Sequence, residues 1–259
     1  MIDFIKAKNA FSQYLKQYDT SDGSIKMKIK HTYEVIHKSE YIAKALNLKE
    51  EDIELAKLIA LLHDIGRFEQ IKETKDFSDN KSFDHADYGE YVLFKKGLIR
   101  EFIEDNQYDK IIKKAIINHN KYQIESGLDE KVLLHCKIIR DADKLDNFRV
   151  KEVEKFEDMF PGHYHSETIH NEKISDKVYE DFKNHKCIKI EDRKTCIDCM
   201  ICVLAFIFDF NFDISLKFIK ENNYINKLIN RFENQNKETV QRIEEIRKIA
   251  NEYVKKPDV

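Results

Sequence analysis

Apolar residues recur every three or four positions along most of the chain, which is the spacing of one face of an α-helix. Near the N-terminus, Phe4, Phe11 and Leu15 form such a stripe, and the pattern predicts a helix over residues 2–18. A turn-rich run of small and polar residues ends this helix. Ser24, at the end of that run, is the expected N-cap of the next helix.

The same spacing predicts helices along the rest of the chain. Before residue 150 they are expected at about residues 24–47, 50–64, 85–95, 109–119 and 129–146. Residues 66–84 lack this periodicity and are expected to form a long loop, which begins where Gly66 ends a helix. About four further helices are expected after the Pro161-Gly162 break. We therefore expect an all-α fold.

Composition agrees with this expectation and narrows the partners. The 259 residues include only six Gly and two Pro, so few tight turns are available. The net charge is −3, and acids and bases alternate without a basic stripe, which argues against duplex nucleic acid as a partner. The first residues do not resemble a secretory signal, and the longest apolar run, Met200–Phe208, is too short to span a bilayer. A cytoplasmic protein with no membrane partner is expected.

Five cysteines in a chain without a recognisable export signal predict reduced thiols rather than disulfides. Cys196, Cys199 and Cys202 have a spacing that suggests a metal site. No second pair completes a set of four ligands, however, and the three lie within an apolar stretch. We interpret them as small buried core residues.

Three of the predicted helices carry ionisable side chains on their apolar faces. Steps of three and four along the apolar residues lead to His63 with Asp64 beside it, to His119, and to Asp143 and Asp146. A lone histidine at such a position is usually a hydrogen-bonded core residue. A buried carboxylate without a partner costs several kcal/mol, so the aspartates require a metal, a cation or hydrogen-bond donors.

Two more histidines extend this group, because His85 opens a predicted helix and His31 lies one turn before Val35 on another. The candidate metal ligands are therefore His31, His63, Asp64, His85, His119 and Asp143. This set of nitrogen and oxygen donors suits Fe, Mn, Co or Zn, with Mg also compatible. A bridging carboxylate would serve two ions roughly 3.5–4 Å apart, so we expect one or two divalent ions.

The same residues carry a resemblance to a known family. The motifs are His31, the His63-Asp64 pair in LLHDIGR, Asp143 in DADKLD, His85 in DHADYG and His119 in IINHN. Together these motifs resemble the HD superfamily of metal-dependent phosphohydrolases over about residues 25–150. The motifs of His85 and His119 are similar to those of its branches that bind two metals. The resemblance implies an HD-domain helical bundle with a C-terminal helical extension.

By this resemblance the first ion would be held by His31, His63, Asp64 and Asp143, while Asp64 would bridge to a second ion held by His85 and His119. Some two-metal branches, such as the HD-GYP enzymes, carry a second consecutive histidine where this chain has Asn120. The Gly-Tyr-Pro signature is absent as well. Both differences argue against a cyclic-di-GMP phosphodiesterase.

A metal pair would explain hydrolysis without a serine or cysteine nucleophile, because it lowers the pKa of a bound water toward about 7. Metal-bound hydroxide would then attack a phosphoryl group. The candidate catalytic residues are the bridging Asp64 and two cations that would clamp a phosphate, Arg67 and Lys144. Family members carry a basic residue at the position of Arg67. A surface or structural ion pair is the alternative for both cations.

The sequence thus predicts a hydrolase that acts on a small phosphate ester or anhydride, with a nucleotide as the expected substrate. Two alternatives remain open. The same ligand set serves HD-type di-iron oxygenases, and the chain could instead be a non-catalytic metal-binding interaction module. Ligands alone do not distinguish these functions.

The predicted domains are an N-terminal helix that packs on the core (residues 1–24), the HD domain (25–159) and a C-terminal helical extension (160–259). An amphipathic last helix that includes Ile243 and Ile246 would cap the core or support a homodimer.

Further polar residues have roles that the sequence leaves open. Asp146 and Arg140 would orient Asp143 or pair with each other. His163, His165 and His170 are expected in an exposed loop outside the site, and His37 and His135 are expected to be solvated or structural.

Overall fold

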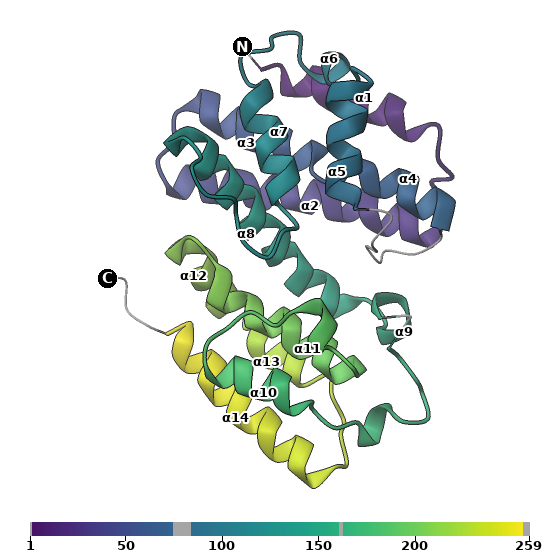
Figure 1. Cartoon of the computed structure of the whole chain (residues 1–259), viewed down its shortest axis with the longest axis vertical. Helices are drawn as coiled ribbons and strands as arrows, with labels where there is room; N and C mark the ends of the chain where they lie inside the picture. Colours follow the sequence, from purple (N-terminus) through teal and green to yellow (C-terminus); the bar gives the residue numbers. More distant parts are fainter. Residues whose placement is uncertain (1, 75–83, 161–162, 256–259) are drawn as a thin grey trace. The chain divides into compact units, whose positions relative to one another are not determined.

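A computed structural model describes residues 2–74, 84–160 and 163–255. These residues form helices joined by short connections, and no strand occurs among them (Figure 1). The predicted all-α fold is confirmed. Within the described part of the chain, no helix has both the length and the apolar character needed to cross a membrane.

By compactness the chain divides into two units, Met1–Asp143 and Lys144–Val259, and the division falls inside α8. The helices of the first unit are α1 (Phe4–Leu15), α2 (Gly23–Ala45), α3 (Glu50–Leu62), α4 (Ile65–Thr74), α5 (His85–Glu90), α6 (Ile99–Phe102), α7 (Asp109–Asn118) and the start of α8 (Glu130–Val153). The domain limits predicted from the sequence remain a prediction, because compactness and domain homology divide a chain on different grounds.

Aspartates define where the first two helices begin. The Asp3 carboxylate accepts a hydrogen bond from the Lys6 amide at the start of α1. Asp22 does the same for α2, where it accepts from the amides of Ser24 and Ile25. The expectation that Ser24 caps this helix was therefore wrong by two positions. The carboxylate of Asp22 satisfies two of the unpaired amides of the first turn.

The core of the first unit lies between α2 and α3, which pack against each other, with α1 laid across α3 and α6. The apolar stripe of α1 is buried through Ala7, Phe11 and Leu15. The ring of Phe11 meets that of Phe68 edge to face, with 5.8 Å between centroids. This core holds the end of α3, where the candidate ligands begin.

The predicted loop over residues 66–84 was wrong in its described part. Residues 65–74 form α4, whose side chains Ile65, Phe68 and Ile71 are all buried. Their spacing of three was present in the sequence but was masked by the charged residues between them. Residues 75–83 of that predicted loop lie outside the described residues.

Two other helices differ from their predicted limits. The predicted helix over residues 85–95 is α5 followed by a π-helical turn, η1 (Tyr91–Lys95). The helix that carries Asp143 continues past residue 146 to Val153. Both differences lie beyond the residues that carry the candidate ligands. His63, Asp64 and His119, predicted as the last residues of helices, lie just past the ends of α3 and α7.

Gly66 and Gly89 allow α4 and α5 to approach closely. A Cβ atom on Gly66 would lie 2.3 Å from the carbonyl oxygen of His85 and 2.6 Å from the amide nitrogen of Gly89. Real Cβ atoms do not approach backbone atoms at such distances. Gly66 is therefore a packing residue that brings the His63-Asp64 pair next to His85, and not the end of a helix as the sequence suggested.

The second unit is also helical. Its elements after α8 are α9 (Phe156–Met159), η2 (Ile169–Asn171), α10 (Asp176–Lys183), η3 (Ile190–Asp192), α11 (Cys196–Leu204), η4 (Ala205–Asp209), α12 (Asp213–Glu221), α13 (Tyr224–Ile229) and α14 (Lys237–Tyr253). Residues 163–255 thus contain five α-helices, one more than predicted for the part of the chain after the break. The Pro161-Gly162 break lies outside the described residues.

A buried helix and a buried carboxylate organise this unit. Every residue of α11 is buried, including its three cysteines, which agrees with their interpretation as core residues. Asp198 accepts hydrogen bonds from the Ser175 hydroxyl and the Ser175 amide and thereby ties α11 to the start of α10. The amphipathic face of α14 is buried through Ile243, Ile246 and Ala250.

The close approach at Gly66 predicts a strong effect of a single methyl group. Gly66→Ala should lower the free energy of unfolding by about 1–3 kcal/mol, because backbone atoms cannot move aside as a flexible side chain can. Gly23→Ala is the matched control, since a Cβ there meets nothing within 4 Å. Urea unfolding of both variants tests this, and a Gly66→Ala protein as stable as the control would contradict it.

Candidate metal centre

Six side chains from five helices of the first unit converge on one region. His31 comes from α2, His63 is the C-cap of α3, Asp64 connects α3 to α4, His85 opens α5, His119 is the C-cap of α7, and Asp143 lies on α8. Three of these positions are helix ends, where the chain turns and a side chain can leave the helical row. The structure thus brings together all six ligands predicted from the sequence.

The Asp64 carboxylate lies at the middle of the cluster. Its Oδ2 is 3.3 Å from Nε2 of His63 and 3.5 Å from Nε2 of His31. Its Oδ1 is 3.2 Å from Nε2 of His85 and 3.7 Å from Nε2 of His119. Asp143 completes the first side, with Oδ1 at 3.1 Å from Nε2 of His31. Each oxygen of Asp64 therefore faces a different pair of imidazoles.

Backbone hydrogen bonds determine the tautomers of two of these histidines. Nδ1 of His63 lies 2.7 Å from the carbonyl oxygen of Ala60, and Nδ1 of His119 lies 2.6 Å from that of Ile116. A carbonyl oxygen only accepts, so both Nδ1 atoms carry the proton. In the neutral rings both Nε2 atoms then present lone pairs toward Asp64. A hydrogen bond from Nδ1 to a carbonyl is the usual arrangement of a metal-binding histidine.

The contacts of His85 show that the imidazole Nε2 atoms of the cluster cannot all have a hydrogen-bond donor. Its Nε2 lies 3.1 Å from Nη2 of Arg67, which only donates, and 3.0 Å from Nε2 of His119. If the Arg67 bond is made, two lone pairs face each other across 3.0 Å. The buried Nε2 of His63 has no hydrogen-bond partner among the described residues. A cation between these atoms would relieve both conflicts.

Burial and charge keep the cluster ready for a cation. Burial would raise the pKa of Asp64, but the charge of Lys28 acts against burial and helps to hold this pKa well below its ordinary value. The Asp143 side chain is partly buried, which opposes its charged form, but its hydrogen bond with His31 lowers its pKa. Burial lowers the pKa of His119, so this ring is neutral at pH 7. Charged carboxylates and neutral imidazoles are the forms that bind metal.

The residues therefore fit a divalent metal ion. In each of two buried groups, the ligand atoms lie within 4.8 Å of one another. The first group is His31, His63 and Asp64; the second is Asp64, His85 and His119. Asp64 belongs to both groups, which is what a bridging carboxylate requires. Imidazole with carboxylate suits Zn, Fe, Mn or Co.

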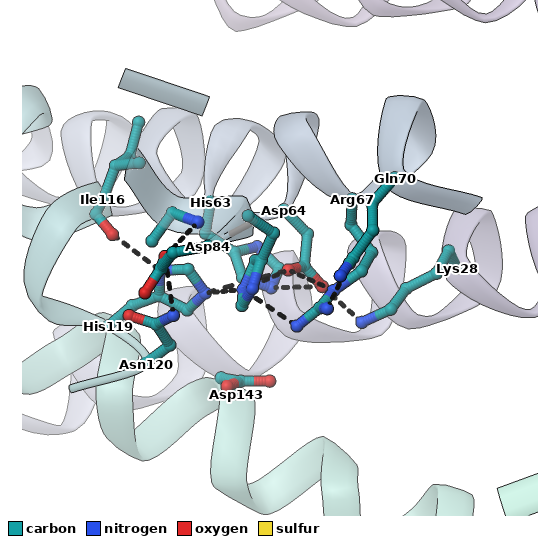
Figure 2. A network of polar contacts seen from close by, with 12 residues as sticks. Lys28, His63, Asp64, Arg67, Gln70, Asp84, Ile116, His119, Asn120 and Asp143 are labelled. Carbon is teal, nitrogen blue, oxygen red and sulfur yellow. Dashed lines mark hydrogen bonds and ion pairs between the residues drawn. The ribbon is translucent and has the colours of Figure 1, made fainter. Parts of the chain in front are cut away.

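Asp84 holds the segments of two ligands together (Figure 2). Its carboxylate caps α5 by accepting from the Ala86 amide, and it also accepts from Nδ2 of Asn120 at 3.1 Å and Nζ of Lys121 at 2.8 Å. The start of α5, with His85, is thus tied to the residues that follow His119. Asn120 therefore has a positioning role at the place where some two-metal branches of the superfamily have a histidine.

Arg140 positions the other side of the His119 segment. Its guanidinium donates to the carbonyl of Asn118 at 2.9 Å and also to those of Lys121 and Tyr122. A buried cation at the C-terminus of α7 also complements the helix dipole there. Asp146 binds Arg149 through both carboxylate oxygens, at 2.6 and 2.8 Å. These bonds show Arg140 supporting the segment of His119, whereas the sequence linked it to Asp143 or Asp146.

The two candidate phosphate-binding cations have different surroundings. Arg67 is buried, lies within 4.0 Å of Oδ1 of Asp64 and donates to the Gln70 side chain. Lys144 forms an ion pair with Asp209. That pair favours the alternative, structural role for Lys144, while Arg67 lies at the ligand cluster.

Sequence reasoning missed Lys28, whose ammonium contacts Oδ2 of Asp64. In Figure 2, Lys28 and Arg67 lie on the side of Asp64 opposite to His119 and Asn120. A signal for Lys28 was available, because it precedes His31 by three residues and so shares its helical face.

Histidines and cysteines outside the cluster have other surroundings. His135 lies 3.3 Å from Oδ1 of Asp52, and Nδ1 of His170 lies 2.8 Å from the carbonyl of Glu233. Within residues 2–74, 84–160 and 163–255, neither these histidines nor any cysteine belongs to a group that could hold a metal. Their exclusion from the site agrees with this arrangement.

Comparison with known families agrees with the geometry. Residues 29–147 match the family model described as HD domain. This stretch contains all six candidate ligand positions and does not reach the predicted C-terminal extension. Residues 29–147 are therefore identified as an HD domain, the domain of a superfamily of helical proteins that includes metal-dependent phosphohydrolases. No curated protein and no solved structure matches the chain significantly.

The shared position of Asp64 predicts how metal content responds to mutation. Wild-type protein loaded with Mn²⁺ should hold two ions per chain, His119→Ala should keep one, and Asp64→Ala should lose both, because only Asp64 belongs to both groups. The exposed His37 lies on α2 outside the cluster, so His37→Ala is the control and should keep the wild-type content. Metal analysis after gel filtration measures this, and full content in Asp64→Ala would exclude the bridge.

Proposed function

We propose that this chain is a metal-dependent hydrolase of phosphoester or phosphoanhydride bonds in a small substrate, with a nucleotide as the expected compound. The HD domain match and the two ligand groups support a metal-dependent hydrolase. The position of Arg67 at those ligands supports a phosphorylated substrate. The net charge of −3, without a basic stripe along the sequence, supports a compact substrate over a nucleic acid.

The proposal depends mainly on the position of Arg67 beside two candidate ligands, His85 and Asp64. Its Nη2 lies 3.1 Å from Nε2 of His85, and the same guanidinium is oriented by Gln70, which is itself fully buried. An ion held by His85 would take the lone pair that Arg67 contacts, and the guanidinium would then bind a phosphoryl oxygen in its place. A guanidinium so placed binds two oxygens of a phosphate side by side.

The chain's own residues prepare the site for hydrolysis. Bound metal supplies a water of lowered pKa and neutralises charge on a phosphoryl oxygen. His63 and His119 keep their Nε2 atoms aimed at Asp64 because their Nδ1 protons are bound to backbone carbonyls. Asp84 and Arg140 fix the segment of His119, so the ligand geometry does not depend on a mobile loop. Arg67 orients the phosphoryl group and compensates its charge.

Arg67→Met should raise KM for a phosphorylated substrate by about tenfold or more while metal content stays at the wild-type level, because a charge-assisted bidentate bond is lost and no ligand is removed. The assay is anaerobic release of phosphate, with Mn²⁺, from p-nitrophenyl phosphate and from nucleoside mono-, di- and triphosphates. Arg100→Met is the control, since Arg100 pairs with Asp109 away from the ligand motifs.

Two results of this assay would contradict the proposal. One is turnover that requires both Fe and O₂, which would indicate an oxygenase. The other is metal binding without release of phosphate from any compound in the panel, which would indicate a metal-dependent binding module. An unchanged KM in Arg67→Met would exclude the role of Arg67 but leave hydrolysis in place.

A further inference from the structure

Lys28 is a cation at the ligand cluster that the ligand motifs do not include. It lies on α2, and its ammonium donates to Oδ2 of Asp64. The side chains of Lys28 and Asp64 are 16% and 4% exposed, so this ion pair is largely shielded from water. In such surroundings the attraction between the two charges is much stronger than at a protein surface.

The oxygen that Lys28 contacts belongs to the first ligand group. Oδ2 is the atom that faces Nε2 of His31 and Nε2 of His63, at 3.5 and 3.3 Å. An ion held by these two histidines and Asp64 would coordinate this same oxygen. A divalent ion and an ammonium on one carboxylate oxygen repel each other, so each lowers the affinity of the oxygen for the other.

Lys28 also supplies what Asp64 needs when no ion is bound. The Asp64 side chain is only 4% exposed, and the Lys28 ammonium is in direct contact with its Oδ2. The other cation nearby, Arg67, is farther away, with Nε at 4.0 Å from Oδ1. A buried carboxylate that loses its partner destabilises a protein strongly. The Lys28 ammonium therefore stabilises the folded protein when no metal is bound.

We propose that Lys28 is an internal counter-cation that stabilises Asp64 before metal binds and competes with the first ion for Oδ2. This proposal rests on the metal centre of the proposed function. The metal affinity of the centre is then lower than its ligands alone would give, and the protein folds before an ion arrives. Its long and partly exposed side chain lets Lys28 withdraw toward solvent when an ion enters.

The experiment compares Lys28→Met with Lys30→Met, which removes the same charge from an exposed position of the same helix. Mn²⁺ is titrated calorimetrically at pH 7.5 into protein stripped with EDTA. Lys28→Met should bind the first Mn²⁺ about tenfold or more tightly than wild type, because the competing ammonium is gone. Lys30→Met should bind as wild type does, and so should Lys28→Arg, which keeps the charge.

Thermal unfolding provides a readout that is independent of activity. Stripped Lys28→Met should melt at least about 4 °C below stripped wild type, because Asp64 has lost its partner. With saturating Mn²⁺ most of this difference should disappear, since the ion then compensates the carboxylate. Lys28→Gln, a neutral polar variant, serves the same comparison if the methionine variant does not fold.

The outcomes separate this proposal from the function it rests on. Equal or weaker Mn²⁺ binding in the neutral variants would overturn the competition, even if the protein hydrolyses phosphate as proposed. A wild-type protein that binds no Mn²⁺ would overturn both proposals. Tighter binding together with lower stability of the stripped protein supports the role of Lys28 whatever the substrate is.

Discussion

One constraint underlies the rest of the first unit, namely that the buried Asp64 carboxylate needs positive charge. Imidazole nitrogens surround both of its oxygens, and two of them present lone pairs because their other ring nitrogens donate to backbone carbonyls. Acceptors that face one another in a low-dielectric interior are unfavourable without a cation. These side chains are therefore favourably placed if a cation binds among them, and their burial would cost free energy if none did.

The scaffold meets this need by placing ligands at the ends of helices and then fixing those ends. Close contact between Gly66 and Gly89 sets α4 against α5, so that Asp64 and His85 become neighbours. Asp84 joins the start of α5 to the segment after His119, and Arg140 holds the same segment through backbone carbonyls. Ligand geometry is thus determined by packed helices and backbone bonds rather than by long side chains alone.

Two cations near Asp64 have contrasting surroundings and, we propose, contrasting roles. Lys28 contacts Oδ2, on the side of the first ligand group, and competes with metal there. Arg67 contacts His85, on the side of the second group, and is oriented by Gln70, where it would bind a phosphoryl group of the proposed substrate. A flexible ammonium can leave when an ion arrives, whereas a planar guanidinium held by a neighbour remains in place for an anion.

Helical class and most buried faces could be read from the sequence, because periodicity is a local property. The six candidate ligands could be proposed from it, because the cost of a buried carboxylate is local as well, and the structure brings these six side chains together. Helix α4 was missed because charged residues obscured the spacing of Ile65, Phe68 and Ile71. The tertiary structure decided which lone pairs converge on Asp64. It also decided that Asp64 pairs with Lys28 and that Lys144 pairs with Asp209. Such pairings join residues far apart in the chain, and their distances depend on how helices pack, which no local pattern encodes.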